Sequence, residues 1–202
     1  MGLWIAPAKL VLASRSESRH AILLAAGIPH EVAPADIDER LIEQRAGTGD
    51  GALVAELLAR EKALAVSARR PGALVLGADQ TLALGERRFS KPKDRTSARE
   101  QLLLLRNRTH ELHCAIAVVR DDTVLFEHRE VAQLTMRRFS EAFLEAYLDA
   151  VGSAAAGSVG GYQLERVGIQ LFERVTGDHF VILGLPLLAL LAFLRRDGVL
   201  VE

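Results

Sequence analysis

The segment Ala73–Asp79 (ALVLGAD) constrains the fold more than any other stretch of the sequence, because it joins an uncharged apolar run to a carboxylate. A short, continuous apolar run is typical of a strand that is buried on both faces of a sheet. In open α/β sheets, ligands bind at the carboxyl ends of the strands. An idle carboxylate behind so apolar a strand would cost free energy, so we expect Asp79 to end the strand at a ligand-binding edge.

A second apolar run, residues 9–14 (KLVLAS), predicts another buried strand that leads directly into a helix. Either Ser14 or Ser16 can cap this helix, which is expected to run to Ala26 with Gly27 as its stop. The unpaired backbone N–H groups at such a helix start are a common phosphate site. This segment is therefore a candidate for binding a phosphorylated ligand.

The rest of the chain alternates between helical and extended patterns. Helices are expected over about residues 51–69, over 96–106 with Thr96 or Ser97 as the cap, over 140–151, and from about Pro186. The apolar stripe of the first comprises Leu53, Val54, Leu57, Leu58, Leu64 and Ala65, with Lys62 outside it. Extended segments are expected over residues 28–40 with an acidic turn at their end, in a hairpin around Gly85, in two long strands around Asp121 and Asp122, and over 169–175.

This order of elements indicates an α/β fold with a mixed, twisted sheet and flanking helices. The chain has 202 residues, of which 50% are hydrophobic and 25% charged, as in an ordinary globular protein. No linker or repeat divides it, so residues 1–202 are expected to form a single domain.

Composition also excludes several kinds of partner. The formal net charge of -1 gives no overall field for nucleic acid or an anionic membrane. A single cysteine, Cys114, and the absence of a targeting pattern at the start suit the cytoplasm. The apolar run 180–194 is shorter than the roughly 20 residues of a membrane-spanning helix and contains Pro186, so we expect a buried strand end, a turn and a helix there.

Four segments carry groups suited to phosphoanhydride hydrolysis: ASRSESR, DIDER, GADQ and SKPKD. This chemistry needs carboxylates for a divalent cation, cations for the phosphates, and a base for the attacking water. Glu39 and Asp79 can hold Mg²⁺ or Mn²⁺, and Lys62, Lys91 and Arg19 can balance a triphosphate. Each of these residues, taken alone, also fits a plain solvent-exposed or turn position.

Seven short strings, in this order along nearly the whole chain, resemble the Maf family of nucleoside triphosphate pyrophosphatases: LVLASRSESR, DIDE, AREKA, GADQT, SKPKD, RTHE and GLPL. The resemblance implies a cytoplasmic, often dimeric α/β protein with two lobes around a substrate cleft. It also implies hydrolysis of a nucleoside triphosphate, such as a non-canonical one, to the monophosphate and pyrophosphate with a divalent metal. A regulator of cell division that binds nucleotide without turnover is the alternative.

The resemblance places the family's site residues on positions of this chain. The catalytic set falls on Glu39, Lys62, Asp79 and Lys91, with Glu39 and Asp79 also binding the metal. Asp79 is the implied proton acceptor for the attacking water. Because nearby lysines and a metal lower the pKa of a carboxylate, we expect Asp79 chiefly to orient the water. The implied substrate-binding residues are Ser14, Ser16, Arg19, Gln80 and Glu165.

The chain departs from the family pattern at three positions that concern the base and the phosphates. Ser18 stands where an arginine is common, Gln80 follows the aspartate where members that prefer dTTP and UTP have threonine, and Glu165 stands where those members have glutamine. Gln80 and Glu165 resemble the branch that acts on 7-methyl-GTP, whose cationic purine suits a carboxylate. That branch has an aromatic residue near position 18, so the base preference stays open.

The string HELHC is not a metal motif, because His110 and His113 are three residues apart on a strand. Strand alternation sets them on opposite faces, so we expect structural roles for both.

Overall fold

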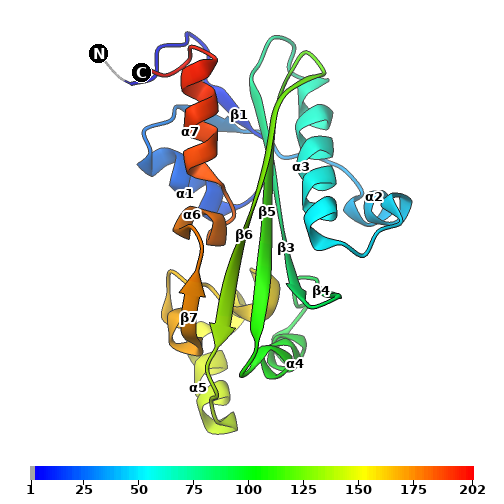
Figure 1. Cartoon of the computed structure of the whole chain (residues 1–202), viewed down its shortest axis with the longest axis vertical. Coiled ribbons are helices and arrows are strands. Elements are labelled where there is room, and N and C mark those ends of the chain that lie inside the picture. The colour runs from blue at the N-terminus through cyan, green and yellow to red at the C-terminus, as the bar shows by residue number, and fades with distance from the viewer. Residues whose placement is uncertain (1–2) are drawn as a thin grey trace.

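A mixed sheet of seven strands forms the centre of the computed structural model, which describes residues 3–202 (Figure 1). The order is β2-β1-β3-β5-β6-β7, with β4 paired to β3. β1 is parallel to both of its neighbours, and every other pairing is antiparallel. The predicted α/β class with a mixed sheet is therefore confirmed. The strands are β1 (Leu10–Leu12), β2 (His30–Val32), β3 (Val75–Leu84), β4 (Arg87–Phe89), β5 (Thr109–Arg120), β6 (Thr123–Met136) and β7 (Phe172–Thr176).

Helices cover the sheet in three groups (Figure 1). α1 and α7 share one apolar cluster, α3 packs against another on β3 and β5, and α4 and α5 enclose the largest cluster. The helices are α1 (Glu17–Ala25), α2 (Glu39–Ala46), α3 (Gly51–Ser67), α4 (Arg95–Leu105), α5 (Glu141–Val151), α6 (His179–Ile182) and α7 (Leu187–Arg196), with 3₁₀ turns η1 (Gly152–Ala156), η2 (Val159–Gly161) and η3 (Val167–Leu171). Within residues 3–202, no helix combines the length and the apolar character needed to cross a bilayer.

β3 is longer than its apolar sequence suggests. It continues through Asp79 to Leu84, because it also forms a hairpin with β4 and a long ladder with β5. The expectation that Asp79 ends the strand is therefore wrong. Its parallel neighbour β1 ends much earlier, at the pair Leu12–Leu76. Asp79 thus lies just beyond the carboxyl end of β1, which keeps it at an edge where a ligand has access.

α3 lies unusually close to β3, and small residues make this approach possible. A Cβ atom added at Gly77 would lie 2.0 Å from the backbone oxygen of Ala59. The expected apolar stripe on α3 is correct at Val54 and Leu58 but wrong at Leu53, which is 45% exposed. Half of the other buried residues of α3 are alanines, which carry little hydropathic signal: Ala55, Ala59 and Ala63.

Other differences from the expected elements have local causes. Asp94, rather than Thr96 or Ser97, caps α4 by accepting from the Ser97 backbone N–H at 2.8 Å. Residues 180–182 belong to the short helix α6 instead of a strand end, because Asp178 caps a helical turn there. The expected strand at 169–175 begins only at Phe172, since the residues before it form η3.

Candidate active site in an open cavity

A cavity of about 1260 Å³ lies beside the middle of β3 and the start of α1. Its walls come from segments far apart in the chain, including the loop after β4 and the loop that contains η2. The predicted site residues are all among those that line it: Ser14, Ser16, Arg19, Glu39, Lys62, Asp79, Gln80, Lys91 and Glu165. The fold therefore brings together groups that the sequence spreads over some 150 positions.

Lys62 lies between the two predicted metal-binding carboxylates. Its Nζ is 2.5 Å from Asp79 Oδ1 and 2.7 Å from Glu39 Oε1. The side chains of Lys62 and Asp79 are only 12% and 11% exposed, whereas that of Glu39 is 50% exposed. Glu39 is oriented by its place in the first turn of α2, whose N-cap is Asp38. Lys62 is therefore not the ordinary surface residue that a helix position would suggest.

The environment of Asp79 changes its acidity in a direction opposite to the expected one. Burial raises the pKa of the Asp79 carboxyl, and this effect exceeds the lowering by the charges of Lys62 and Arg19. Lys62 lowers the pKa of Asp79 as expected, but burial, which the expectation left out, outweighs it. A raised pKa makes the ionised carboxylate a better proton acceptor.

The loop between β1 and α1 (residues 13–16), here called the first loop, is held in place by its own serines. Ser14 Oγ accepts from the backbone N–H of Ser16 at 3.2 Å and from Arg19 Nη1 at 3.0 Å. Ser16 is the N-cap of α1 and accepts from the Arg19 backbone N–H. The structure thus selects Ser16 over Ser14 as the cap. Both hydroxyls fix the loop backbone at the edge of the cavity.

Arg19 is buried, and most of its donors are already used. Its Nε donates to Gly184 O at 2.7 Å, and its Nη1 donates to Ala78 O at 2.8 Å as well as to Ser14. These bonds tie α1 to β3 and to the turn after α6. Arg19 therefore adds positive charge beside Asp79 while acting as a brace between three segments.

Gln80 braces the same turn. Its Nε2 donates to Val181 O at 2.8 Å and to Ile182 O at 3.1 Å. The residues after these two, Leu183 and Gly184, line the cavity. A change at Gln80 can therefore alter the cavity by moving its wall, apart from any direct contact with a base.

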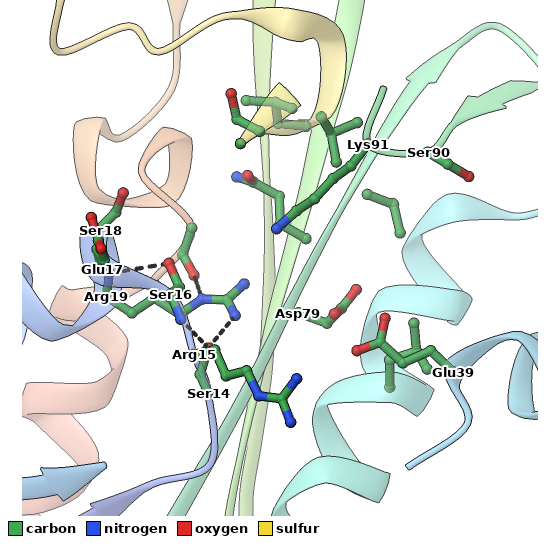
Figure 2. A pocket seen from close by; sticks show the side chains of 18 of the residues that line it. Ser14, Arg15, Ser16, Glu17, Ser18, Arg19, Glu39, Asp79, Ser90 and Lys91 are labelled. Atoms are coloured by element: carbon green, nitrogen blue, oxygen red, sulfur yellow. Dashed lines mark hydrogen bonds between the residues drawn. The ribbon is translucent and has the colours of Figure 1, made fainter. Parts of the chain in front are cut away.

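Figure 2 shows how the charged side chains face the cavity. Lys91 extends inward from the loop after β4, and Asp79 and Glu39 point toward the same space from the opposite wall. Arg15 extends from the loop between β1 and α1 into this region, although the sequence patterns did not single it out. Exposed Glu165 also belongs to the lining.

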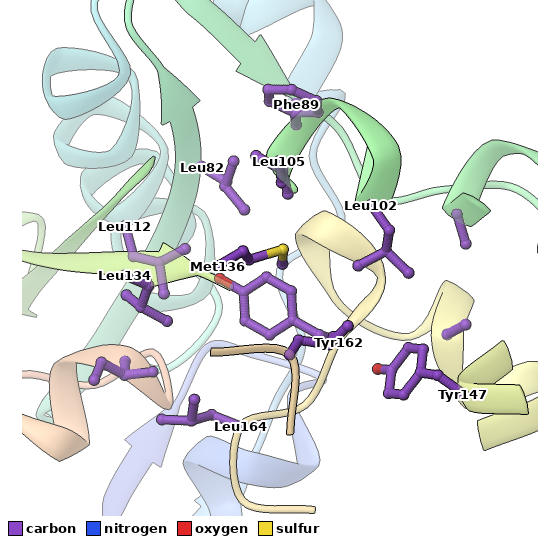
Figure 3. Close-up of a cluster of buried hydrophobic side chains, with 14 of the residues drawn as sticks. Leu82, Phe89, Leu102, Leu105, Leu112, Leu134, Met136, Tyr147, Tyr162 and Leu164 are labelled. Carbon is purple, nitrogen blue, oxygen red and sulfur yellow. The ribbon is translucent and has the colours of Figure 1, made fainter. Parts of the chain in front are cut away.

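Buried aromatic residues anchor the glycine-rich segment that carries Glu165 (Figure 3). The Tyr162 hydroxyl and His110 Nε2 form a hydrogen bond of 2.7 Å, and the Tyr147 hydroxyl donates to Gly161 O at 3.1 Å. His110 is buried, whereas His113 lies on the other face of β5 beside Glu111. The expected placement of the two histidines on opposite faces is confirmed.

The site residues fit a magnesium-type ion. Two carboxylates already converge on a cation, the Lys62 ammonium, so their oxygens lie close enough to share a ligand. Residues 3–202 contain no group of three or more His, Cys, Asp or Glu side chains arranged for a metal. Few protein ligands are the usual case for Mg²⁺, which keeps water and takes phosphate oxygens.

Comparison with known proteins decides the family. The family described as Maf-like protein matches residues 9–197. The chain belongs to the Maf family. Maf relatives named "Nucleoside triphosphate pyrophosphatase" include one from Rhodopseudomonas palustris (strain BisB18), 55% identical over 200 residues that cover 99% of each chain. Another, from Paramagnetospirillum magneticum, is 53% identical and covers 95% of this chain and all of the relative.

Among solved structures, a HAM1 protein from Coxiella burnetii aligns with 65% of this Maf chain and 74% of its own, at 20% identity and a TM-score of 0.42.

Proposed function

We propose that this Maf chain is a nucleoside triphosphate pyrophosphatase, which hydrolyses a nucleoside triphosphate to the monophosphate and pyrophosphate. The observation that carries the proposal is the group Glu39–Lys62–Asp79 at the wall of a large open cavity. Relatives that match over the full chain bear the name of this activity. A protein that only binds nucleotide does not need a buried carboxylate with raised proton affinity.

In the proposed reaction, Asp79 directs a water molecule at the α-phosphorus. The water oxygen forms a bond to that phosphorus as the bond from the phosphorus to the α–β bridging oxygen breaks in line. The proton of the water passes to the Asp79 carboxylate, and the electron pair of the broken bond leaves with pyrophosphate. Burial and the short contact with Lys62 hold the Asp79 carboxylate in one place at the cavity wall, so that it can orient the water.

Glu39 and Asp79 would hold the divalent metal, Mg²⁺ or Mn²⁺. The bound ion supplies charge neutralisation for the phosphate oxygens. Lys62 keeps the two carboxylates in place through its short contacts with both. Lys91, which reaches into the cavity without an ion-pair partner among residues 3–202, stabilises the charge that develops on the leaving pyrophosphate.

The substrate's base is proposed to lie near Glu165, in the part of the cavity formed by the glycine-rich segment. An exposed carboxylate there suits a cationic purine such as 7-methylguanine, or the N–H edge of a guanine-like base. Ser18 provides no aromatic ring for stacking on such a base. We therefore propose a non-canonical nucleotide with a guanine-like purine as the first candidate substrate and 7-methyl-GTP as the second.

The remaining expectations accompany this proposal. They are a single domain over residues 1–202, two lobes on either side of the cavity, a cytoplasmic location and a homodimer. Sedimentation of the purified protein tests the last of these.

The decisive experiment is product analysis with Mg²⁺ or Mn²⁺ and a panel of canonical, deaminated and 7-methylated nucleotides. We expect release of pyrophosphate from at least one of them and its loss in Asp79→Asn. Lys91→Gln should lower turnover, whereas Lys93→Gln serves as a matched control, because Lys93 is exposed and lies outside the cavity. Release of orthophosphate would contradict the reaction class, and tight binding without turnover would favour the regulator.

A further inference from the structure

The positively charged side chains around the cavity differ in whether they already form ion pairs or hydrogen bonds within the protein. Lys62 is shared by Glu39 and Asp79, so these three groups together carry a net negative charge. Arg88 is paired with Glu43 at 3.1 Å. Thus much of the positive charge near the cavity is already paired with carboxylates of the protein. A triphosphate needs cations that remain available to it.

The Nε and Nη1 donors of Arg19 are also used within the protein. This matters because the loop between β1 and α1 has few other positively charged side chains. Two backbone carbonyls and Ser14 accept from its Nε and Nη1. The common family loop has a second arginine at the position of Ser18, which here is a neutral side chain at the cavity. The loop would therefore lack a free cation if no other residue supplied one.

Arg15 is placed to supply it. The residue lines the cavity and is exposed, and no ion pair or side-chain hydrogen bond of Arg15 occurs within residues 3–202. Its backbone is held between Ser14 and Ser16, whose mutual hydrogen bond of 3.2 Å closes around it. Figure 2 shows its guanidinium extended toward the space that Asp79 and Glu39 face. A fixed backbone thus carries a free, phosphate-matching group to the wall opposite Lys91.

Two other free arginines line the cavity, but their surroundings suit this role less. Arg40 directly follows the acidic segment 36–39, whose carboxylates reduce its attraction for an anion. Arg166 directly follows Glu165. Arg15 instead lies next to the start of α1, where the N–H groups of the helix favour negative charge and offset the nearby Glu17 carboxylate.

We propose that Arg15 binds the triphosphate of the substrate, as the exposed cation of this loop that forms no ion pair or side-chain hydrogen bond within residues 3–202. The inference rests on the proposed pyrophosphatase function. It assigns to this chain a phosphate-binding residue that the sequence patterns did not single out.

The test uses the full chain, Mg²⁺, and the nucleotide that the unmodified protein hydrolyses fastest. Arg15→Gln should lower kcat/KM by about tenfold or more, as expected for a lost hydrogen bond between charged groups. Most of the effect should appear in KM. Arg15→Lys should keep part of the activity, because it retains the charge without the planar fork. Arg45→Gln is the control, since Arg45 is exposed and outside the cavity.

The most informative variant moves the positive charge from position 15 to position 18. Adding Ser18→Arg to Arg15→Gln should restore most of the lost kcat/KM, because an arginine at position 18 also faces the cavity. A purely structural role of Arg15 would not be rescued in this way. The inference is wrong if Arg15→Gln and the Arg45→Gln control differ by less than about twofold, the size of an ordinary surface effect. It is also wrong if Ser18→Arg restores nothing while both proteins keep the melting temperature of the parent.

Failure of the proposed function gives a different result. If the unmodified protein hydrolyses no nucleotide in the panel, titration calorimetry with inorganic pyrophosphate tests Arg15 directly. Weaker binding in Arg15→Gln but not in Arg45→Gln then supports the inference, and equal binding overturns it.

Discussion

At the scale of single residues, Lys62 is the group on which the candidate site depends most. Its ammonium separates two carboxylates that would otherwise repel each other, and its side chain is largely shielded from water. Nothing in its helical position revealed this, because Lys62 lies outside the apolar stripe expected from the sequence. The need of phosphate chemistry for cations and the family resemblance, and not periodicity, selected it.

We predict that Lys62→Met lowers kcat/KM by about a hundredfold, the size seen when one charge-stabilising group is removed from an active site. Glu39 and Asp79 would then face each other without a cation. Pyrophosphate release measures the effect. Lys9→Met is the control, since Lys9 is exposed and distant from the cavity. Activity equal to that of the control would remove Lys62 from the proposed mechanism.

Gln80 offers a test of specificity that acts through the backbone. Gln80→Ala removes two hydrogen bonds to the turn at Val181 and Ile182, which should destabilise the protein by about 1–2 kcal/mol. The relative kcat/KM values for two nucleotides that differ only in the base should also change. Gln133→Ala is the matched control, because Gln133 bonds only to exposed Glu111. An unchanged ratio would show that the turn does not influence base choice.

At the scale of elements, the sequence predicts best those helices and strands whose burial follows a regular apolar pattern. The long β5–β6 pair follows from such a pattern, whereas the hairpin at Gly85 and the end of α1 at Gly27 follow from glycines in the left-handed conformation. Helix α2 was missed because none of its residues is buried, so it has no apolar stripe. Only its Asp38 cap and the left-handed Gly47 mark its limits.

The close contact between α3 and β3 gives a prediction about stability. Gly77→Ala places a Cβ atom against the backbone of Ala59, so α3 must move outward. We expect a loss of about 1–3 kcal/mol, as for other overpacked cores, seen as a lower urea midpoint. Gly49→Ala is the control, because its Cβ would meet open space. A midpoint equal to that of the control would show that α3 adjusts freely.

The same shift of α3 would also carry Lys62 away from Asp79. Activity of Gly77→Ala should therefore fall even at temperatures where the variant is fully folded.

At the scale of the whole molecule, the buried pair of His110 and Tyr162 couples stability to pH. Burial lowers the pKa of His110 from 6.5 to about 4. Between these values the unfolded chain binds a proton that the folded protein does not, so stability falls as the pH falls from 6.5 toward 4. The shift corresponds to about 3 kcal/mol.

We predict that His110→Phe makes the free energy of unfolding less dependent on pH in this interval, as measured by urea denaturation at several pH values. The substitution also leaves the Tyr162 hydroxyl without its partner, so the variant should be less stable than the parent at neutral pH. His20→Gln, an exposed position, is the control. A pH dependence equal to that of the parent would contradict the prediction.

The candidate site shows where reasoning from the sequence ends. Residue types and order led to Glu39, Asp79 and Lys91, because metal and phosphate chemistry requires such groups. The hydrogen bonds of Arg19 to Ala78 and Gly184 could not be foreseen, since they join positions 59 and 165 residues apart. The exposure of Arg15 to the cavity is likewise a result of the three-dimensional arrangement.

The bond from Arg19 to Gly184 also has a consequence for the synthesis of the protein. A ribosome makes the loop between β1 and α1 well before the carbonyl that accepts from Arg19 Nε, which follows 165 residues later. Until then, Arg19 can bond to Ser14 and Ala78 but not to Gly184, so the turn after α6 cannot complete the cavity wall. Chains that end before Gly184 should therefore be inert toward nucleotides, because the candidate site lacks this part of its wall.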